Sequence, residues 1–147
     1  MSLQEKLQED LKAAMKSKDS RRLSVIRLAK AAVKNAEIAK KRELNDDEVL
    51  EVLSREVKQR RDAIPEFQKG NRPDLVESLE AEIAILMEYL PQQMSEEEIR
   101  QVAREVVAAV GAKDAKDMGK VMGALMPKVK GKADGRLVNQ VVKELLQ

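Results

Sequence analysis

The sequence predicts an all-α protein, with an antiparallel four-helix bundle in its N-terminal part and a small three-helix tail domain at its C-terminus. Charged residues make up 37% of the 147 residues and aromatic residues only 1%, a composition that favours helices over strands. Apolar residues recur at helical spacing along most of the chain. Asparagine, serine and aspartate precede several of these apolar patterns, as expected of residues that cap helix N-termini.

Two helices are predicted in the first forty residues. The first ends near Lys18 and carries an apolar residue at every fourth position: Leu3, Leu7, Leu11 and Met15. Asp19 or Ser20 can cap the second. The predicted buried face of the second helix consists of Leu23, Ile26, Ala29, Val33 and Ala36 or Ile38.

A third helix is predicted to begin after Asn45, which forms a capping-box pattern with Glu48, and to run to Lys69. Pro65 can bend it. Residues 70–73, Gly-Asn-Arg-Pro, then end this helix and begin a fourth, because Gly commonly follows a helix and Pro fits its first turn. The fourth helix is expected to bury Leu75, Leu79, Ile83, Leu86 and Met87. Four amphipathic segments with short connections are typical of an antiparallel bundle.

Residues 91–94, Pro-Gln-Gln-Met, mark the predicted boundary between domains of residues 1–90 and 95–147. The tail domain begins with a second capping-box pattern, Ser95 with Glu98, and Gly111 ends the helix that follows. Its apolar face is predicted to hold Ile99, Val102, Val106, Val107 and Val110.

The sixth helix is predicted to begin at Asp114 or Asp117, and Pro127 is expected to end or kink it. Asp134 is expected to cap a seventh helix. The buried residues of the seventh helix are predicted to be Leu137, Val138, Val141, Val142, Leu145 and Leu146.

The composition also restricts the chemistry. The chain has no Cys and no His, which excludes disulfides, thiolate catalysis and the commonest general base and metal ligand. Acidic residues 46–48 could hold Mg²⁺, but acidic side chains in a first helical turn simply complement the helix dipole. We therefore predict no catalytic residue, metal or cofactor. The charged N-terminus and the lack of an apolar run of about 20 residues predict a cytoplasmic protein without a membrane partner.

The stretch from 114 to 147 holds four of the six glycines: Gly119, Gly123, Gly131 and Gly135. Gly119 and Gly123 are four residues apart, so a helix places them on one face as a strip without side chains. Glycine inside a helix costs about 0.5–1 kcal/mol relative to alanine, so the pair indicates the close approach of another backbone. That backbone could belong to another helix of this protein or to an outside ligand such as RNA.

The same stretch is basic. From residue 113 onward the chain has eight basic and four acidic residues, whereas residues 1–94 carry eighteen of each sign. The candidate RNA-binding residues are Lys116, Lys120, Lys128, Lys130, Lys132 and Arg136. With only one Phe and one Tyr, stacking on bases is not expected, so recognition would depend on phosphates and shape. The alternative is that these lysines form an ordinary solvated surface.

Three long segments resemble the YqeY family: residues 34–75, EIAILMEYLPQQMSEEEI at 82–99, and KDMGKVMGALMPKVKGKADGRLVNQVVKELL at 116–146. The resemblance covers essentially the whole chain. It implies a helical bundle followed by a helical tail domain. It also implies kinship with the helical and tail regions of the B subunit of tRNA-dependent amidotransferase, whose tail is thought to contact tRNA. The MGKVMG and KGKADGRLV motifs of the tail begin at Met118 and Lys130.

The resemblance associates the chain with glutamine-dependent carbon–nitrogen ligases, but nothing in it resembles the glutamate-activating cradle domain of that subunit. We therefore expect no intrinsic enzymatic activity. Two functions of different classes stay open: a module that binds tRNA or another structured RNA, and a protein–protein interaction module or amidotransferase-associated factor.

Overall fold

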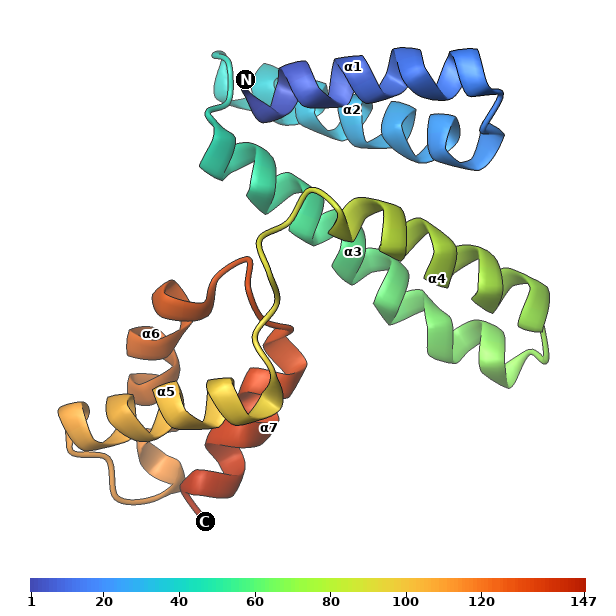
Figure 1. The fold of residues 1–147 in the computed structure, drawn as a ribbon. Coiled ribbons are helices and arrows are strands. Elements are labelled where there is room, and N and C mark those ends of the chain that lie inside the picture. Colours follow the sequence, from blue (N-terminus) through green and yellow to red (C-terminus); the bar gives the residue numbers. More distant parts are fainter. The chain divides into compact units, whose positions relative to one another are not determined.

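The computed structural model describes residues 1–147 and contains seven α-helices, one short 3₁₀ helix and no strand (Figure 1). This confirms the predicted all-α class. The chain divides into two compact units, Met1–Leu90 and Pro91–Gln147, each with its own hydrophobic core.

The first unit consists of two helical hairpins. Helix α1 (Leu3–Ser17) packs against α2 (Ser20–Lys40), and α3 (Asp46–Lys69) packs against α4 (Pro73–Met87) (Figure 1). Helix α2 also contacts α3 and α4, which joins the two hairpins around one core. The largest fully buried side chains of this core are Leu7, Ile26, Leu53 and Leu86.

The predicted helix starts in this unit are confirmed by their hydrogen bonds. The Asp19 side chain accepts a hydrogen bond from the backbone N–H of Arg22. Both halves of the Asn45–Glu48 capping box are present at the start of α3. Helix α3 then continues through Pro65 to Lys69 without interruption.

Two predicted core residues are exposed, and three others, Leu23, Leu75 and Leu79, are only partly buried. Met15 is 54% exposed, and Ala14 is buried in its place. A spacing of four residues advances 400° around a helix, so a stripe of such residues rotates by 40° at each step and has left the core side by Met15. Ile38 is 65% exposed because it follows Val33 by five residues, about 140° around the helix, whereas Ala36 packs against the core.

The second unit consists of α5 (Glu96–Val110), the 3₁₀ helix η1 (Ala115–Asp117), α6 (Met118–Val129) and α7 (Gly135–Leu145). Each pair of its three α-helices is in contact. Its core is built from residues at helical spacing on all three: Ile99, Ala103 and Val106 from α5, Val121, Leu125 and Val129 from α6, and Val138, Val141 and Val142 from α7.

The helix boundaries of the second unit largely follow the predicted signals. Ser95 and Glu98 form a complete capping box, and Gly111 ends α5 in the left-handed conformation with φ +69°. Asp134 caps α7 by accepting a hydrogen bond from the backbone N–H of Arg136. Helix α6 differs in its end: it continues two residues beyond Pro127, because the side chain of Val129 is completely buried in the core.

None of the helices combines the length and the apolar character that a membrane crossing requires.

Candidate nucleic-acid interface

The six predicted RNA-binding residues are all exposed, and they fall into two groups at α6 and at the loop that follows it. The first group consists of Lys116 in η1 and Lys120 and Lys128 in α6. The second consists of Lys130 and Lys132 in the α6–α7 loop and Arg136 in the first turn of α7. A helix of 12 residues is about 18 Å long, so Lys116 and Lys132 are separated by about the length of α6.

The glycine strip lies on the solvent side of α6. Gly119 and Gly123 are exposed, and a Cβ added at either would have no atom within 4 Å. Lys120 and Pro127 occupy the same side of α6, opposite the buried Val121, Leu125 and Val129, and Lys116 precedes the helix in η1. The structure therefore excludes one of the two interpretations of the strip within this unit: no other helix of the tail packs on these glycines.

The other two glycines have different roles. Gly131 has φ +75°, a left-handed conformation that side chains rarely adopt, and it turns the chain after α6. Gly135 is the first residue of α7 and has open space around it. Only Gly119 and Gly123 thus form a bare helix face.

Two carboxylates near these lysines, Asp114 and Asp117, accept hydrogen bonds from the backbone. Asp114 accepts a hydrogen bond from the backbone N–H of Lys116 at 2.9 Å. Asp117 accepts one from the backbone N–H of Lys113 at 2.8 Å, and this bond is the main cause that lowers the pKa of Asp117. The ammonium groups of four lysines form no salt bridge: Lys116, Lys120, Lys128 and Lys132. Of these, Lys120 lies near enough to Asp117 for its charge to contribute to lowering the pKa of that carboxyl group.

The basic loop is held to the start of the tail domain. The backbone N–H of Met94 donates to the carbonyl oxygen of Lys132 at 2.8 Å, and the side-chain amide of Gln93 donates to the carbonyl oxygen of Gly131 at 3.0 Å. Sequence reasoning assigned residues 91–94 to the boundary only. These long-range hydrogen bonds have no signal in local spacing, and they fix the backbone that carries Lys130 and Lys132.

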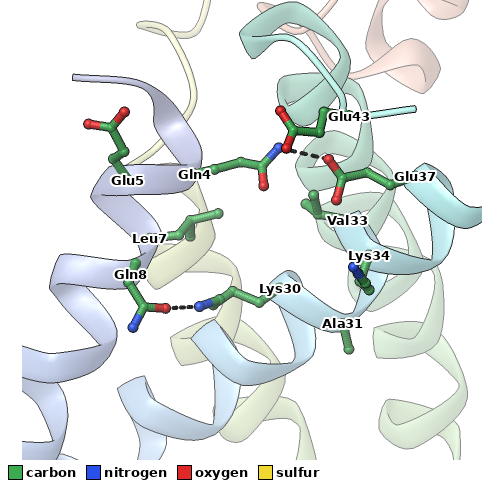
Figure 2. Close-up of a pocket in the computed structure, with 10 residues that line it drawn as sticks. All are labelled: Gln4, Glu5, Leu7, Gln8, Lys30, Ala31, Val33, Lys34, Glu37 and Glu43. Atoms are coloured by element: carbon green, nitrogen blue, oxygen red, sulfur yellow. Dashed lines mark hydrogen bonds between the residues drawn. The ribbon is translucent and has the colours of Figure 1, made fainter.

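A second feature, missed by sequence reasoning, is a groove of about 660 Å³ between α1 and α2 (Figure 2). Its polar groups largely bind one another. The Gln4 amide donates to Glu37 at 3.1 Å, and the Lys30 ammonium donates to the Gln8 carbonyl oxygen (Figure 2). The backbone N–H of Leu44 donates to Glu37 at 2.9 Å, and this bond contributes most to lowering the pKa of Glu37.

The groove brings together no nucleophile with a base, and no group of three acidic residues anywhere in the chain is placed to hold a metal ion. The acidic residues at 46–48 are used in the structure of α3: Glu48 completes the capping box, and Asp46 accepts a hydrogen bond from the backbone N–H of Leu3 at 3.0 Å.

The family model described as Yqey-like protein matches residues 4–146. The chain belongs to the YqeY-like family.

Curated relatives of this YqeY-like chain carry the name "Altered inheritance of mitochondria protein 41, mitochondrial". The protein from Lachancea thermotolerans is 44% identical over 87 residues, which are 58% of this chain and 46% of the relative. The protein from Kluyveromyces lactis is 42% identical over 84 residues, 56% of this chain and 45% of the relative. The protein from Saccharomyces cerevisiae is 36% identical over 110 residues, 73% of this chain and 60% of the relative. The matches span about half the length of these relatives.

The names of these relatives contradict the cytoplasmic location predicted from the sequence, because they describe mitochondrial proteins. That prediction is wrong. It rested on the charged N-terminus and on the absence of a long apolar run, and neither feature determines the compartment in which a helical module is used.

Proposed function

We propose that the tail domain, residues 95–147, binds structured RNA without catalysing a reaction, and that tRNA is its main ligand. The observation that carries the proposal is the outer side of α6, where lysines without an ion pair lie beside a helix face without side chains. Ammonium groups that have no carboxylate partner are available to phosphates. A bare helix face lets a ribose–phosphate chain come closer than side chains would allow.

The two groups of basic residues suit a ligand longer than a single phosphate. They extend over about the length of α6, and consecutive phosphates along one RNA strand could contact both groups. The chain contains a single Phe and a single Tyr, and Tyr89 is buried in the first unit, so base stacking has no support in the tail. Contacts of this kind recognise the shape of an RNA rather than its sequence.

The family resemblance supports tRNA as the first RNA to test, through the kinship it implies with the tail of the amidotransferase B subunit. We assign the chain no reaction of its own, because it has neither His nor Cys and no group of acidic residues placed to hold a metal ion. The competing enzyme hypothesis requires the purified chain alone to release ammonia from glutamine or to amidate Glu-tRNA.

The proposal is tested by measuring tRNA affinity over a series of salt concentrations. Each neutralised phosphate contributes about 0.7–0.9 to the slope of log affinity against log salt, so four contacts give a slope near 3. The Lys128, Lys130 and Lys132 triple-alanine variant should lower the slope by about two to three and weaken binding to every RNA alike. Lys12→Ala with Lys16→Ala is the control, since both lysines are exposed on α1 of the other unit. Equal binding by the tail variant and the parent would leave the lysines as a solvated surface.

The alternative is a protein partner that docks on the glycine strip. The same open space above Gly119 and Gly123 favours it, since a partner helix could also approach there. Salt distinguishes the two, because an apolar interface tolerates added salt far better than phosphate contacts do. Recovery of a protein from lysate that survives both ribonuclease and high salt would favour the protein partner.

A further inference from the structure

Helix α2 has one side that no other part of its unit covers. We call six exposed residues on this side the outer strip of α2: Arg27, Leu28, Ala31, Lys34, Asn35 and Ile38. Leu28 is 51% exposed and Ile38 65%, although side chains of their size are otherwise mostly buried in this chain. The opposite side of α2 supplies Ile26, Ala29 and Val33 to the core.

The spacing of the strip follows the pattern of a helix-pairing seam. Residues 28, 31, 35 and 38 alternate intervals of three and four, which places them in one row along the helix. Arg27 and Lys34 are seven residues apart and flank this row on one side. The strip therefore presents a narrow apolar row with a basic row beside it.

Charge restricts what can cover the strip. It contains no carboxylate. Arg27 forms no ion pair within the chain, and Lys34 forms none either, although its charge contributes to lowering the pKa of the neighbouring Glu37. The single acidic residue of α2, Glu37, lies on the α1 side, where it accepts hydrogen bonds from Gln4 and from the backbone of Leu44. A second copy of this chain would place like charges opposite one another, which is unfavourable.

The strip is also continuous with the groove between α1 and α2. Ala31 and Lys34 belong to both, and Figure 2 shows them on α2 next to Lys30. The nearly buried Leu7 and Val33 form part of the groove lining. The groove lining also carries Glu5, Glu37 and Glu43, so only apolar side chains of a helix lying along α2 could enter this hollow, and its acidic ones would stay over the strip.

We propose that the outer strip of α2 binds an acidic amphipathic helix of a partner protein. The apolar side chains of that helix cover Leu28, Ala31 and Ile38, and its glutamates or aspartates face Arg27 and Lys34. The interaction is independent of the RNA proposed for the tail domain, because it uses residues of the first unit only.

The test uses the full chain and a designed peptide with Leu at the seam positions of each heptad and Glu at both flanking positions. The glutamates keep the peptide from pairing with itself. Fluorescence anisotropy of the labelled peptide gives the affinity, and backbone NMR shifts of the protein locate the contact. A peptide with Lys in place of every Glu is the charge control.

Two pairs of substitutions at exposed positions should weaken binding without unfolding the chain, as checked by circular dichroism and thermal melting. Arg27→Gln with Lys34→Gln should lower the affinity about three- to tenfold, as expected for two surface ion pairs. Leu28→Gln with Ile38→Gln should lower it by about tenfold or more. The matched controls, Arg55→Gln with Lys69→Gln and the single change Met15→Gln, lie outside the strip and should bind as the parent does.

The proposal is supported if the Glu peptide shifts the amides of α2 and loses affinity with both pairs of substitutions. Equal binding of the Lys peptide would overturn it, as would unchanged binding by either pair. Vesicles of phosphatidylcholine and phosphatidylglycerol are tested in parallel. Binding to these vesicles that depends on the strip, with no binding to the Glu peptide, would overturn the proposal in favour of an anionic lipid surface.

Discussion

Replacing both Gly119 and Gly123 by alanine should stabilise the tail domain and weaken its binding to RNA. Gly123 lies in the middle of α6, where alanine is favoured over glycine by about 0.5–1 kcal/mol. Gly119 is the second residue of the helix, where the gain is expected near the lower end of that range. Because an added Cβ meets no atom within 4 Å at either site, no clash reduces this gain, and the sum is about 1–1.5 kcal/mol.

The same substitution at Gly111 is the matched control. An added Cβ there also has no atom within 4 Å, but the residue has φ +69°, which side chains rarely adopt. Gly111→Ala should therefore destabilise the domain by about 1 kcal/mol, through backbone strain alone. Alanine should therefore raise stability at Gly119 and Gly123 and lower it at Gly111. Because all three positions have open surroundings, this difference reports the backbone conformation and not the packing.

Stability is measured by thermal unfolding followed by circular dichroism, with amide hydrogen exchange in α6 to assign the change to the tail domain. For a domain of about this size, 1 kcal/mol shifts the melting temperature by about 4–8 °C. Destabilisation by Gly119→Ala with Gly123→Ala would refute the reasoning, because it would mean that the strip packs against something. A stabilised variant that binds tRNA as the parent does would show that no backbone approaches these glycines. Gly123→Val applies the same test with a larger side chain, and it too should keep the fold.

Three further predictions concern the two cores and one surface cluster. Hydrogen bonding to Arg42 is the main cause that holds the pKa of Glu48 far below its usual 4.5. This stabilisation is fully present above about pH 4.5 and is lost as the pH falls toward the folded-state pKa, so Glu48→Gln should flatten the acid limb of a stability–pH curve. Burial raises the pKa of Tyr89, the single tyrosine, so its absorbance should titrate with a midpoint above the ordinary 10.0 in the folded protein and near it in urea. Leu125→Ala, at a fully buried position, should cost about 2–5 kcal/mol, whereas Leu28→Ala, at a half-exposed one, should change stability by less than about 0.5 kcal/mol.

Features that depend on residues close in sequence were the most predictable. A capping box is defined by two residues three apart, so Asn45 with Glu48 and Ser95 with Glu98 marked the starts of α3 and α5 correctly. Gly111 marked the end of α5 for a similarly local reason, since its left-handed conformation suits glycine.

Errors arose where a spacing had to be carried over several turns. The row of apolar residues at intervals of four in α1 drifts around the helix, so the sequence assigned Met15 to the core where Ala14 lies instead. In α6, Pro127 does not end the helix as one of the two expectations had it, because burial of Val129 in the tail core keeps the last turn helical. The last turn of α6 is stabilised by packing against α5 and α7. Such contacts between helices cannot be read from a local sequence pattern.

The candidate RNA-binding residues were predictable as a group, but their availability was not. Lysine spacing alone does not tell whether a carboxylate from elsewhere in the chain pairs with them. The structure shows that Asp114 accepts a backbone hydrogen bond at the start of η1 and that Asp117 accepts one from Lys113, which precedes η1, while Glu144 pairs with Arg100 at 2.7 Å. The α1–α2 groove had no local pattern at all, because its walls come from two helices.

The glycines of α6 link stability to the proposed function. Their spacing identified a bare side of the helix but left open whether that side faces the interior or the solvent. Facing solvent, Gly119 and Gly123 lower the stability of α6 by about 1–1.5 kcal/mol relative to alanine, and no contact within the tail offsets this loss. A cost without an internal benefit is typical of functional sites, where local stability is given up for access. This loss of stability is consistent with the proposed outside ligand at this face, and the exposed lysines nearby suit a ligand that carries phosphates.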